Sequence, residues 1–356
     1  MSSCHIFCLS RFSCSVLKNL TFVIFTALIF IGLSACATKP SASPLRIESH
    51  PKAITVPYRV SEAGHLIVDV AVNGRTAKPF IIDSGANISA VYEDYLQDFG
   101  LTNTGKTANV SGLVASAVRP ITGRAELQVG SKIFQPNRIV ILETPPNTNN
   151  VVGLLGVDVL SDYMILFNKE TLTATFIPSA DIDRNNFSGW HRITLRNRVG
   201  FLPDKGLYFT TIILKGKPAP VLIDTGSSLN FINWDLATQD ESIKKLQTSL
   251  KKAIRLQGAI DTIPLQLRAV FYDVQLGRKR WAEVDVVVLE FDTLSEIAPV
   301  DGPMMLAGVG FFSPSTFAFD FGGNALYIHK DKLADSSREI QGDIVDVRHR
   351  ASRLSK

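Results

Sequence analysis

The sequence contains few cysteines, and all four lie within its first 36 residues, at Cys4, Cys8, Cys14 and Cys36. The remainder of the chain therefore has no disulfide and no cysteine metal site. The histidines show no metal-ligand spacing, and no HExxH motif is present, which argues against the pattern of a zinc protease. From these absences we expect a protein that works without a metal or another cofactor.

Long hydrophobic runs are also scarce. The most apolar run, residues 20–33, is shorter than the roughly 20 residues that a comfortable membrane span needs. Because Arg11 and Lys18 precede it, residues 1–35 are typical of a signal peptide.

The predicted signal peptide ends in Leu33-Ser34-Ala35-Cys36, which resembles the lipobox of bacterial lipoproteins. The resemblance implies cleavage before Cys36 and acylation of this residue, and several acyl chains together anchor a protein stably to a membrane. Ala37 follows, which in Gram-negative lipoproteins implies sorting to the outer membrane, facing the periplasm. An ordinary secretory leader or an uncleaved anchor is the alternative.

Charge of one sign does not dominate, since the net charge is +4 and much of the basicity lies in the leader and at the end of the chain. Residues 332–356 form a basic tail that ends in RHRASRLSK. Such short tails are usually solvated, so we expect no nucleic-acid partner. Residues 36–53 are rich in Ser, Pro and Ala without an apolar period, which predicts a tether.

From Ile54 onward, short β-branched runs alternate with turn residues. The dipeptides Asn73-Gly74 and Lys215-Gly216 separate strand-like runs and predict β-hairpins. Helical patterns are few, and the candidates are Glu93 to Phe99 and Trp234 to Leu250. The pattern predicts a mainly β protein.

The chain contains an internal repeat, because FIIDSGANIS at residues 80–89 matches VLIDTGSSLN at residues 221–230. Landmark glycines on both sides of the two aspartates keep nearly the same spacing in the two copies. The duplication predicts two β-rich lobes, residues 54–178 and 204–331, with residues 179–203 as the connector. A duplicated pair also suggests a pseudo-twofold axis between the lobes.

The repeat explains why an aspartate stands at the end of each of the two apolar strands. If the axis brings Asp83 and Asp224 together, the two carboxyl groups share one proton, so that one acts as a base on water and the other as an acid. Neighbouring Ser84 and Thr225 would fix the geometry through hydrogen bonds to the opposite lobe. A serine hydrolase is disfavoured because neither Ser84 nor Ser227 has an evident histidine partner.

Two D-[ST]-G motifs, each followed later by an apolar segment ending in glycine, resemble the aspartic proteases, either retropepsin-like or pepsin-like. The later segments are VGLLG, ending at Gly156, and MLAG, ending at Gly308. The resemblance implies an all-β, bilobal aspartic-protease fold with two pseudo-twofold-related β-barrel-like lobes. It implies that Asp83 and Asp224 are the catalytic pair, and that Gly156 and Gly308 belong to ψ-shaped loops beneath the catalytic turns.

The resemblance extends to the residues that support the catalytic pair. Gly85 and Gly226 would let backbone amides approach the carboxylates. Ser227, which replaces Ala86 of the first copy, would donate its hydroxyl to Asp224, so that Asp224 holds the charge and Asp83 the proton.

The family also closes a flap hairpin over its cleft. The candidates here are residues 110–121, with Gly112 at the tip, and residues 255–265, with Gly258. Neither contains the tyrosine of pepsin-like flaps, and the pepsin disulfides are absent. We therefore expect two tandem units of retropepsin type in one chain.

These observations predict an aspartic endopeptidase of the bacterial cell envelope, monomeric, acting on a peptide or protein and attached to the membrane through Cys36. The alternative is a non-catalytic peptide-binding envelope lipoprotein on the same fold. If Asp83 and Asp224 only capped turns, one motif would be explained, but its repetition in the same sequence context would not.

Overall fold

The computed structural model of this protein describes residues 48–112, 116–146, 150–198, 206–239, 254–257, 262–265, 267–289 and 302–330. The predicted signal peptide, Cys36 and the basic tail lie outside these residues. Within the described part of the chain, no helix is both long enough and apolar enough to cross a bilayer.

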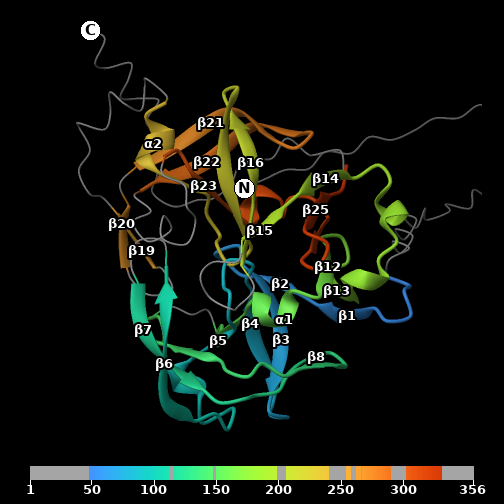
Figure 1. Cartoon of the computed structure of the whole chain (residues 1–356), viewed down its shortest axis with the longest axis vertical. Helices are drawn as coiled ribbons and strands as arrows, with labels where there is room; N and C mark the ends of the chain where they lie inside the picture. The colour runs from blue at the N-terminus through green and yellow to red at the C-terminus, as the bar shows by residue number, and fades with distance from the viewer. Residues whose placement is uncertain are drawn as a thin grey trace, which may run out of the picture. The chain divides into compact units, whose positions relative to one another are not determined.

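The first half of the chain forms thirteen of the described strands, with short helical turns between them (Figure 1). The strands are β1 (Ile54–Pro57), β2 (Arg59–Val60), β3 (Leu66–Val72), β4 (Lys78–Ile82), β5 (Ala90–Tyr92), β6 (Asn103–Ser111), β7 (Ser116–Thr122), β8 (Leu127–Val129), β9 (Lys132–Phe134), β10 (Val140–Leu142), β11 (Gly153–Leu155), β12 (Tyr163–Asn168) and β13 (Thr173–Pro178). The helical turns are η1 (Glu93–Tyr95), α1 (Val157–Leu160), η2 (Ser179–Asp181) and η3 (Arg184–Phe187).

The second half repeats this alternation of strands and single helical turns. Its described strands are β14 (His191–Thr194), β15 (Arg196–Arg198), β16 (Leu207–Leu214), β17 (Lys217–Asp224), β18 (Phe231–Ile232), β19 (Ile254–Gln257), β20 (Thr262–Leu265), β21 (Leu267–Leu276), β22 (Lys279–Val288), β23 (Met305–Gly308), β24 (Phe317–Asp320) and β25 (Ala325–Ile328). Its helical turns are α2 (Trp234–Ala237) and η4 (Val309–Phe311).

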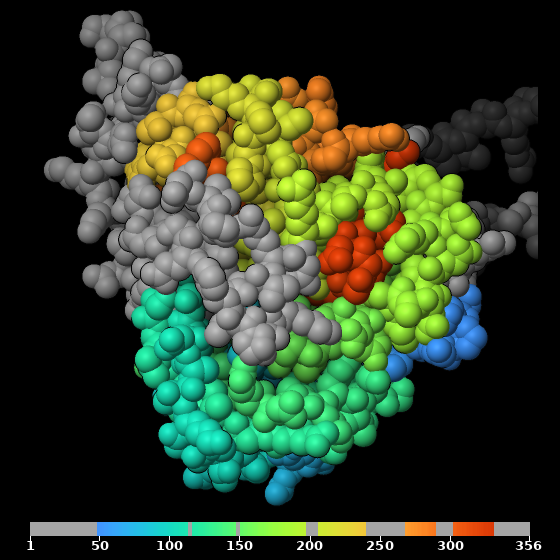
Figure 2. Space-filling view, in the orientation of Figure 1, coloured from blue at the N-terminus to red at the C-terminus, as the bar shows by residue number. Residues whose placement is uncertain are grey.

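Strands of both halves join in one six-stranded sheet, in the order β1-β13-β12-β24-β25-β14. Its central pair is antiparallel, with Ile165 of β12 opposite Phe319 of β24. In the space-filling view, the red residues of the last strands lie between green and yellow-green residues from the end of the first half and the start of the second (Figure 2). The order is symmetric about its centre, as the predicted pseudo-twofold relation requires.

The symmetric sheet also bears on where the second repeat starts. β14 pairs with β25 as β1 pairs with β13, so β14 has the place in the second half that β1 has in the first. Both β14 and β15 lie in the range predicted as a connector, 179–203. The predicted lobe boundaries stay predictions, and the connector contributes strands to two sheets.

In the first half, the side chains of β3 and β4 alternate between two apolar clusters because successive strand residues point to opposite faces. Val68, Val70 and Ile82 belong to the main core, whereas Ile67 and Ile81 belong to a smaller cluster. Both faces of these strands are therefore covered. Asp83 follows β4 directly.

In the second half, a seven-stranded sheet closes on itself because β16 pairs with β17 on one side and with β21 on the other. This closure confirms a barrel-like lobe. The predicted turn between β16 and β17 is confirmed, since Lys215 and Gly216 have φ of 49° and 77° and Leu214 pairs with Lys217. Such positive angles characterise the two-residue turns that match strand twist. At Asn73-Gly74 a turn is also present, with φ of 50° and 68°, but β4 starts only at Lys78, so the connection is longer than the two residues predicted.

Both predicted helices are shorter than expected. At Glu93 to Phe99 the structure has η1 followed by a turn, which ends at Gly100 with φ of 61°. The predicted helix at Trp234 to Leu250 is only α2 at its start, because residues 238 and 239 form a turn, and residues 240–250 lie outside the described residues. At this point the Thr238 hydroxyl donates to the Trp234 carbonyl at 2.8 Å, a local bond that competes with helix continuation.

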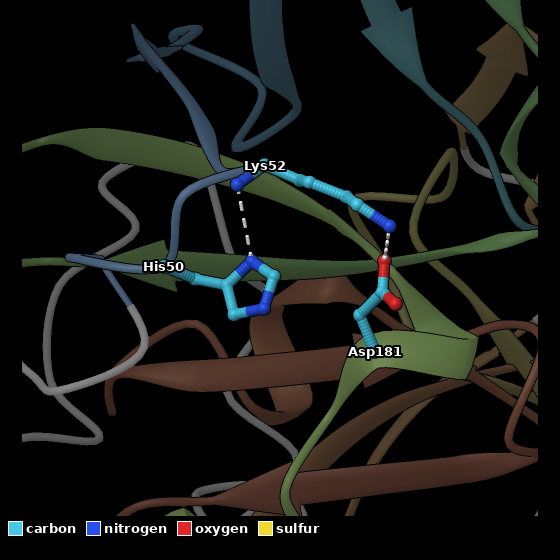
Figure 3. Close-up of polar contacts among 3 residues, drawn as sticks. All are labelled: His50, Lys52 and Asp181. Atoms are coloured by element: carbon cyan, nitrogen blue, oxygen red, sulfur yellow. Dashed lines mark hydrogen bonds and ion pairs between the residues drawn. The ribbon is translucent and has the colours of Figure 1, made fainter.

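The chain just before β1 is attached to the folded part by an ion pair. Lys52 Nζ lies 2.9 Å from Asp181 Oδ2 of η2, and the Lys52 backbone N–H donates to His50 Nδ1 at 3.2 Å (Figure 3). The last residues of the predicted tether, 48–53, are thus held by polar contacts. Because both side chains of the ion pair are substantially exposed, the pair contributes little to stability.

Candidate active site

Two strand ends, one in each half, are joined by four reciprocal hydrogen bonds. The Ser84 backbone N–H donates to Thr225 Oγ1 at 2.9 Å, and the Thr225 N–H donates to Ser84 Oγ at 2.9 Å. Each hydroxyl then donates to a carbonyl of the opposite strand, Ser84 to Ile223 at 2.9 Å and Thr225 to Ile82 at 2.7 Å. Both side chains are fully buried. The hydroxyls therefore lock the two turns together, as the sequence predicted.

The glycines after these hydroxyls bring each turn against the aspartate of the other half. A Cβ added to Gly85 would lie 2.5 Å from the Asp224 Cγ, and one added to Gly226 would lie 2.2 Å from the Asp83 Cγ. No side chain fits in either position. Each glycine N–H also donates to the aspartate of its own turn at 2.8 Å. The structure thus places Asp83 and Asp224 in one site, each between its own turn and the opposite glycine.

The pKa values of both carboxyl groups are raised, because burial disfavours their charged forms. The pKa of Asp83 is raised well above its usual value, since the charge of Asp224 adds to the burial. For Asp224, hydrogen bonds from the Gly226 amide and the Asp83 side chain oppose the effect of burial. The proton is therefore shared within the pair, and the stronger rise of the Asp83 pKa has the direction predicted for the asymmetry.

The predicted reason for this asymmetry is wrong. The hydroxyl of Ser227 donates to the carbonyl of Leu229 at 2.8 Å and not to Asp224. Only its backbone amide acts on Asp224, as that of Ala86 acts on Asp83. The serine finds a carbonyl two residues away, a local bond that short hydroxyl side chains often make in turns.

The two later glycines lie beneath the turns that carry Asp83 and Asp224. β11 pairs parallel with β4 and antiparallel with β5, and β23 pairs in the same way with β17 and β18. A Cβ on Gly156 would lie 2.7 Å from the Ala86 carbonyl oxygen, and one on Gly308 would lie 2.3 Å from that of Leu229. Only glycine allows this crossing. The structure thus gives Gly156 and Gly308 the places predicted for them.

Polar side chains fasten these crossings to the turns. In the first half, Ser89 Oγ accepts from the Gly156 N–H at 3.0 Å and donates to Asp158 at 2.7 Å. In the second half, Asn230 Oδ1 accepts from the Gly308 N–H at 3.0 Å. None of these three residues was predicted from the sequence. The available signal was that Ser89 and Asn230 occupy the same last position of the two repeated decapeptides.

Both flap candidates fall on hairpins. β6 and β7 are antiparallel, with Ser111 opposite Ser116, and the hairpin extends back to Asn103, beyond the predicted range of 110–121. Gly112 directly follows β6. β19 and β20 form the second hairpin, whereas Gly258 lies outside the described residues. That either hairpin closes over substrate stays a prediction.

Tyr92 is a further residue of the site that sequence reasoning missed. It is buried at the end of β5, and burial together with the charge of Asp83 raises the pKa of its hydroxyl to about 12. The phenol is therefore protonated, and able to donate a hydrogen bond, well above physiological pH. No sequence pattern marked it, because its approach to Asp83 depends on the pairing of β5 with β11.

The hydrogen bonds of the two turns limit which side chains there can react. The Ser84 hydroxyl is fully engaged between the strands, so it is not a nucleophile. Among the described residues, no group of three or more His, Cys, Asp or Glu side chains could hold a metal ion. What the geometry provides is a carboxyl pair with one shared proton, which can activate a water and protonate a carbonyl oxygen.

Comparisons with known proteins agree with this geometry. Residues 68–162 match a family described as "gag-polyprotein putative aspartyl protease", and residues 210–311 match the family "Aspartyl protease". The comparison with curated proteins finds no match.

A solved structure resembles the whole described fold. The aspartic proteinase from Irpex lacteus is 13% identical, with a TM-score of 0.50 over 80% of this chain and 99% of that one. At this identity the likeness shows the fold alone. The predicted fold, all-β and bilobal, is confirmed.

Proposed function

Since the chain belongs to the retropepsin-like and pepsin-like aspartic proteases, we propose that it is an endopeptidase whose catalytic pair is Asp83 and Asp224. The observation that carries the proposal is the cross-approach of the two turns, in which Gly85 lies against Asp224 and Gly226 against Asp83. A peptide or protein is the substrate, because the family acts on peptide bonds. Both aspartates come from one chain, which supports a monomeric enzyme.

The protonation of the pair assigns a role to each carboxyl group. Asp224, which holds the charge, takes a proton from a water, and the water oxygen forms a bond to the carbonyl carbon of the peptide. Asp83 gives its proton to the carbonyl oxygen, so that a neutral tetrahedral intermediate forms. Asp224 then returns a proton to the amide nitrogen, the C–N bond breaks, and Asp83 regains a proton from the intermediate.

Cleavage of an unstructured protein such as casein tests the proposal. We expect Asp83→Asn and Asp224→Asn each to abolish cleavage, and a pepstatin-like inhibitor to block the wild type. Asp98→Asn is the control, because Asp98 is an exposed partner of Lys78 at 3.2 Å. Cleavage that survives in both active-site variants would refute the mechanism. Peptide binding without cleavage at any pH from about 4 to 8 would favour a non-catalytic binder instead.

We also propose that the enzyme is a lipoprotein of the bacterial envelope, anchored at Cys36 to the outer membrane and facing the periplasm. The support is the lipobox-like Leu33-Ser34-Ala35-Cys36 after an apolar run. In cells fed a labelled fatty acid, the wild type should incorporate label and fractionate with the membrane, whereas Cys36→Ser should not. Labelling that persists in Cys36→Ser, or an unlabelled wild type, would contradict the proposal.

A further inference from the structure

The β6–β7 hairpin carries a positively charged side chain on the face that packs against the smaller apolar cluster of the first half. Arg119 of β7 stands opposite Ala108 of β6 and shares its side of the strand with Ile121. Ala108 and Val110 pack against the smaller apolar cluster, and Ile121 belongs to it. The Arg119 side chain therefore lies on the apolar inner face of the hairpin, and only 16% of it is exposed.

The same cluster reaches the catalytic pair. It contains Ile81, two residues before Asp83, and Tyr92, whose pKa responds to the charge of Asp83. It also contains Leu142 of β10, which pairs with β7. This buried cluster thus links the end of β4, next to the carboxyl pair, to the β6–β7 hairpin that carries Arg119.

The hydrogen-bonding capacity of Arg119 is only partly used. Its guanidinium donates through one terminal nitrogen to Glu143, the residue after β10, whose side chain is 67% exposed. Its Nε is buried and has no hydrogen-bond partner among the described residues. A guanidinium offers five N–H donors in a planar fork that matches a carboxylate. The exposed Glu143 is a weak competitor, because water screens it.

We propose that Arg119 recognises an acidic residue of the substrate, so that the enzyme prefers peptides with Asp or Glu a few residues from the cleaved bond. The inference rests on the proposed peptidase function and adds a specificity to it. A substrate carboxylate that reaches the inner face of the hairpin would bond to the free Nε–H and replace or join Glu143. A main-chain carboxylate at a peptide end has the same chemistry, so the experiment must exclude it.

The test uses pairs of peptides that are acetylated and amidated at their ends and differ only by Glu against Gln at one position. We expect the wild type to cleave the Glu peptide with a kcat/KM about tenfold higher, mainly through KM, because hydrogen bonds between charged groups are worth more than neutral ones. The ratio should fall to about one in Arg119→Met and remain in part in Arg119→Lys. It should persist or grow in Glu143→Gln, which removes the competing carboxylate.

The matched control is Arg124→Met, which makes the same change in charge at an exposed arginine that bonds to Gln135 away from the cluster. It should keep the wild-type ratio. Equal cleavage of both peptides by the wild type at every position tested, or a preference that survives in Arg119→Met, would overturn the proposal.

Binding separates this inference from the proposed function. Fluorescence anisotropy with Asp224→Asn measures peptide affinity without turnover, and the Glu peptide should bind about tenfold more tightly than the Gln peptide. Adding Arg119→Met to Asp224→Asn should remove that difference. If the wild type cleaves nothing but this difference is seen, the peptidase function fails and Arg119 recognition stands. If no difference is seen, Arg119 recognition fails.

Discussion

At the scale of single residues, the raised pKa of Asp83 links the stability of the protein to pH. Because the folded-state pKa of Asp83 is above its unfolded value, its protonated form contributes to stability. This contribution is fully present below the unfolded pKa, near 3.8, and is lost as pH rises through the folded-state pKa. Asparagine cannot ionise and is free of this loss. We therefore expect the free energy of unfolding of Asp83→Asn, relative to wild type, to increase as pH rises from about 4 to 8 in urea titrations.

Asp69 provides a control of opposite sign. Its pKa is lowered by hydrogen bonds from Arg59, so its contribution is present above the unfolded pKa and is lost as pH falls through the folded-state pKa. Asp69→Asn should thus lose stability relative to wild type at neutral pH and less at acid pH. A pH slope of the same sign for Asp83→Asn and Asp69→Asn would contradict the raised pKa of Asp83.

The reciprocal bonds between the halves give a second prediction for single residues. Ser84→Ala removes the hydrogen-bond partner of the buried Thr225 N–H and of the Ile223 carbonyl. Each buried polar group left without a partner costs about 1–3 kcal/mol. Thr225→Ser keeps the hydroxyl that makes its two bonds, so it should cost much less. Chemical denaturation of both variants measures the difference. Equal losses would show that packing, and not the hydrogen bonds, joins the turns.

Residues that the repeat presents twice were predictable, and residues that depend on pairing were not. Asp83 and Ser84 could be assigned because Asp224 and Thr225 repeat their context. The Ser227 hydroxyl was assigned wrongly, because a nearby carbonyl competes for it. No sequence pattern marked Arg119, since its burial depends on which neighbours β7 acquires.

At the scale of elements, the crossing of β11 beneath the Asp83 turn requires glycine at position 156. A Cβ there would lie 2.7 Å from the Ala86 carbonyl oxygen and 2.7 Å from the Ile88 carbonyl carbon, which are backbone atoms that cannot move without the turn. We expect Gly156→Ala to cost about 1–3 kcal/mol and to reduce kcat by displacing Asp83.

Gly123→Ala is the control for the crossing, because its nearest atom is the Thr104 Cγ2 at 3.8 Å, an ordinary contact. The melting temperature and the rate of peptide cleavage of Gly123→Ala should be close to those of the wild type. An active and stable Gly156→Ala would show that the crossing tolerates a side chain, contrary to the geometry.

Turns were more predictable than helices at this scale. Lys215-Gly216 carries its conformation in two residues, since both must adopt positive φ. The apolar spacing after Trp234 suggested a long helix, but a local bond from Thr238 accompanies the end of the helix at Ala237. A helical pattern is an average over many residues, whereas a hydrogen bond of this kind acts at a single residue.

At the scale of the whole molecule, the sequence predicted two lobes but not the sheet that unites them. A repeat reveals that two halves are alike, and it contains no signal for how their edges meet. The pairing of β12 with β24 buries Phe167 against Phe317, with the rings stacked at 4.8 Å. These phenylalanines looked like ordinary core residues of their own halves.

The shared sheet predicts that the two halves unfold together. Phe317 is 1% exposed and packs on both Phe167 and Phe312, so Phe317→Ala should cost about 3–5 kcal/mol. Because β12 of the first half pairs with β24, this loss should lower the protection of both halves in hydrogen exchange. Amides of β3 and of β22 should therefore become less protected by the same free energy.

Leu172→Ala is the control for this experiment, because the Leu172 side chain is 50% exposed and its loss should change protection little. If the halves were independent units, Phe317→Ala would weaken β22 alone and leave β3 at its wild-type protection. A common loss in both strands would mean that one cooperative unit holds the carboxyl pair, since β4 leads to Asp83 in one half and β17 ends at Asp224 in the other.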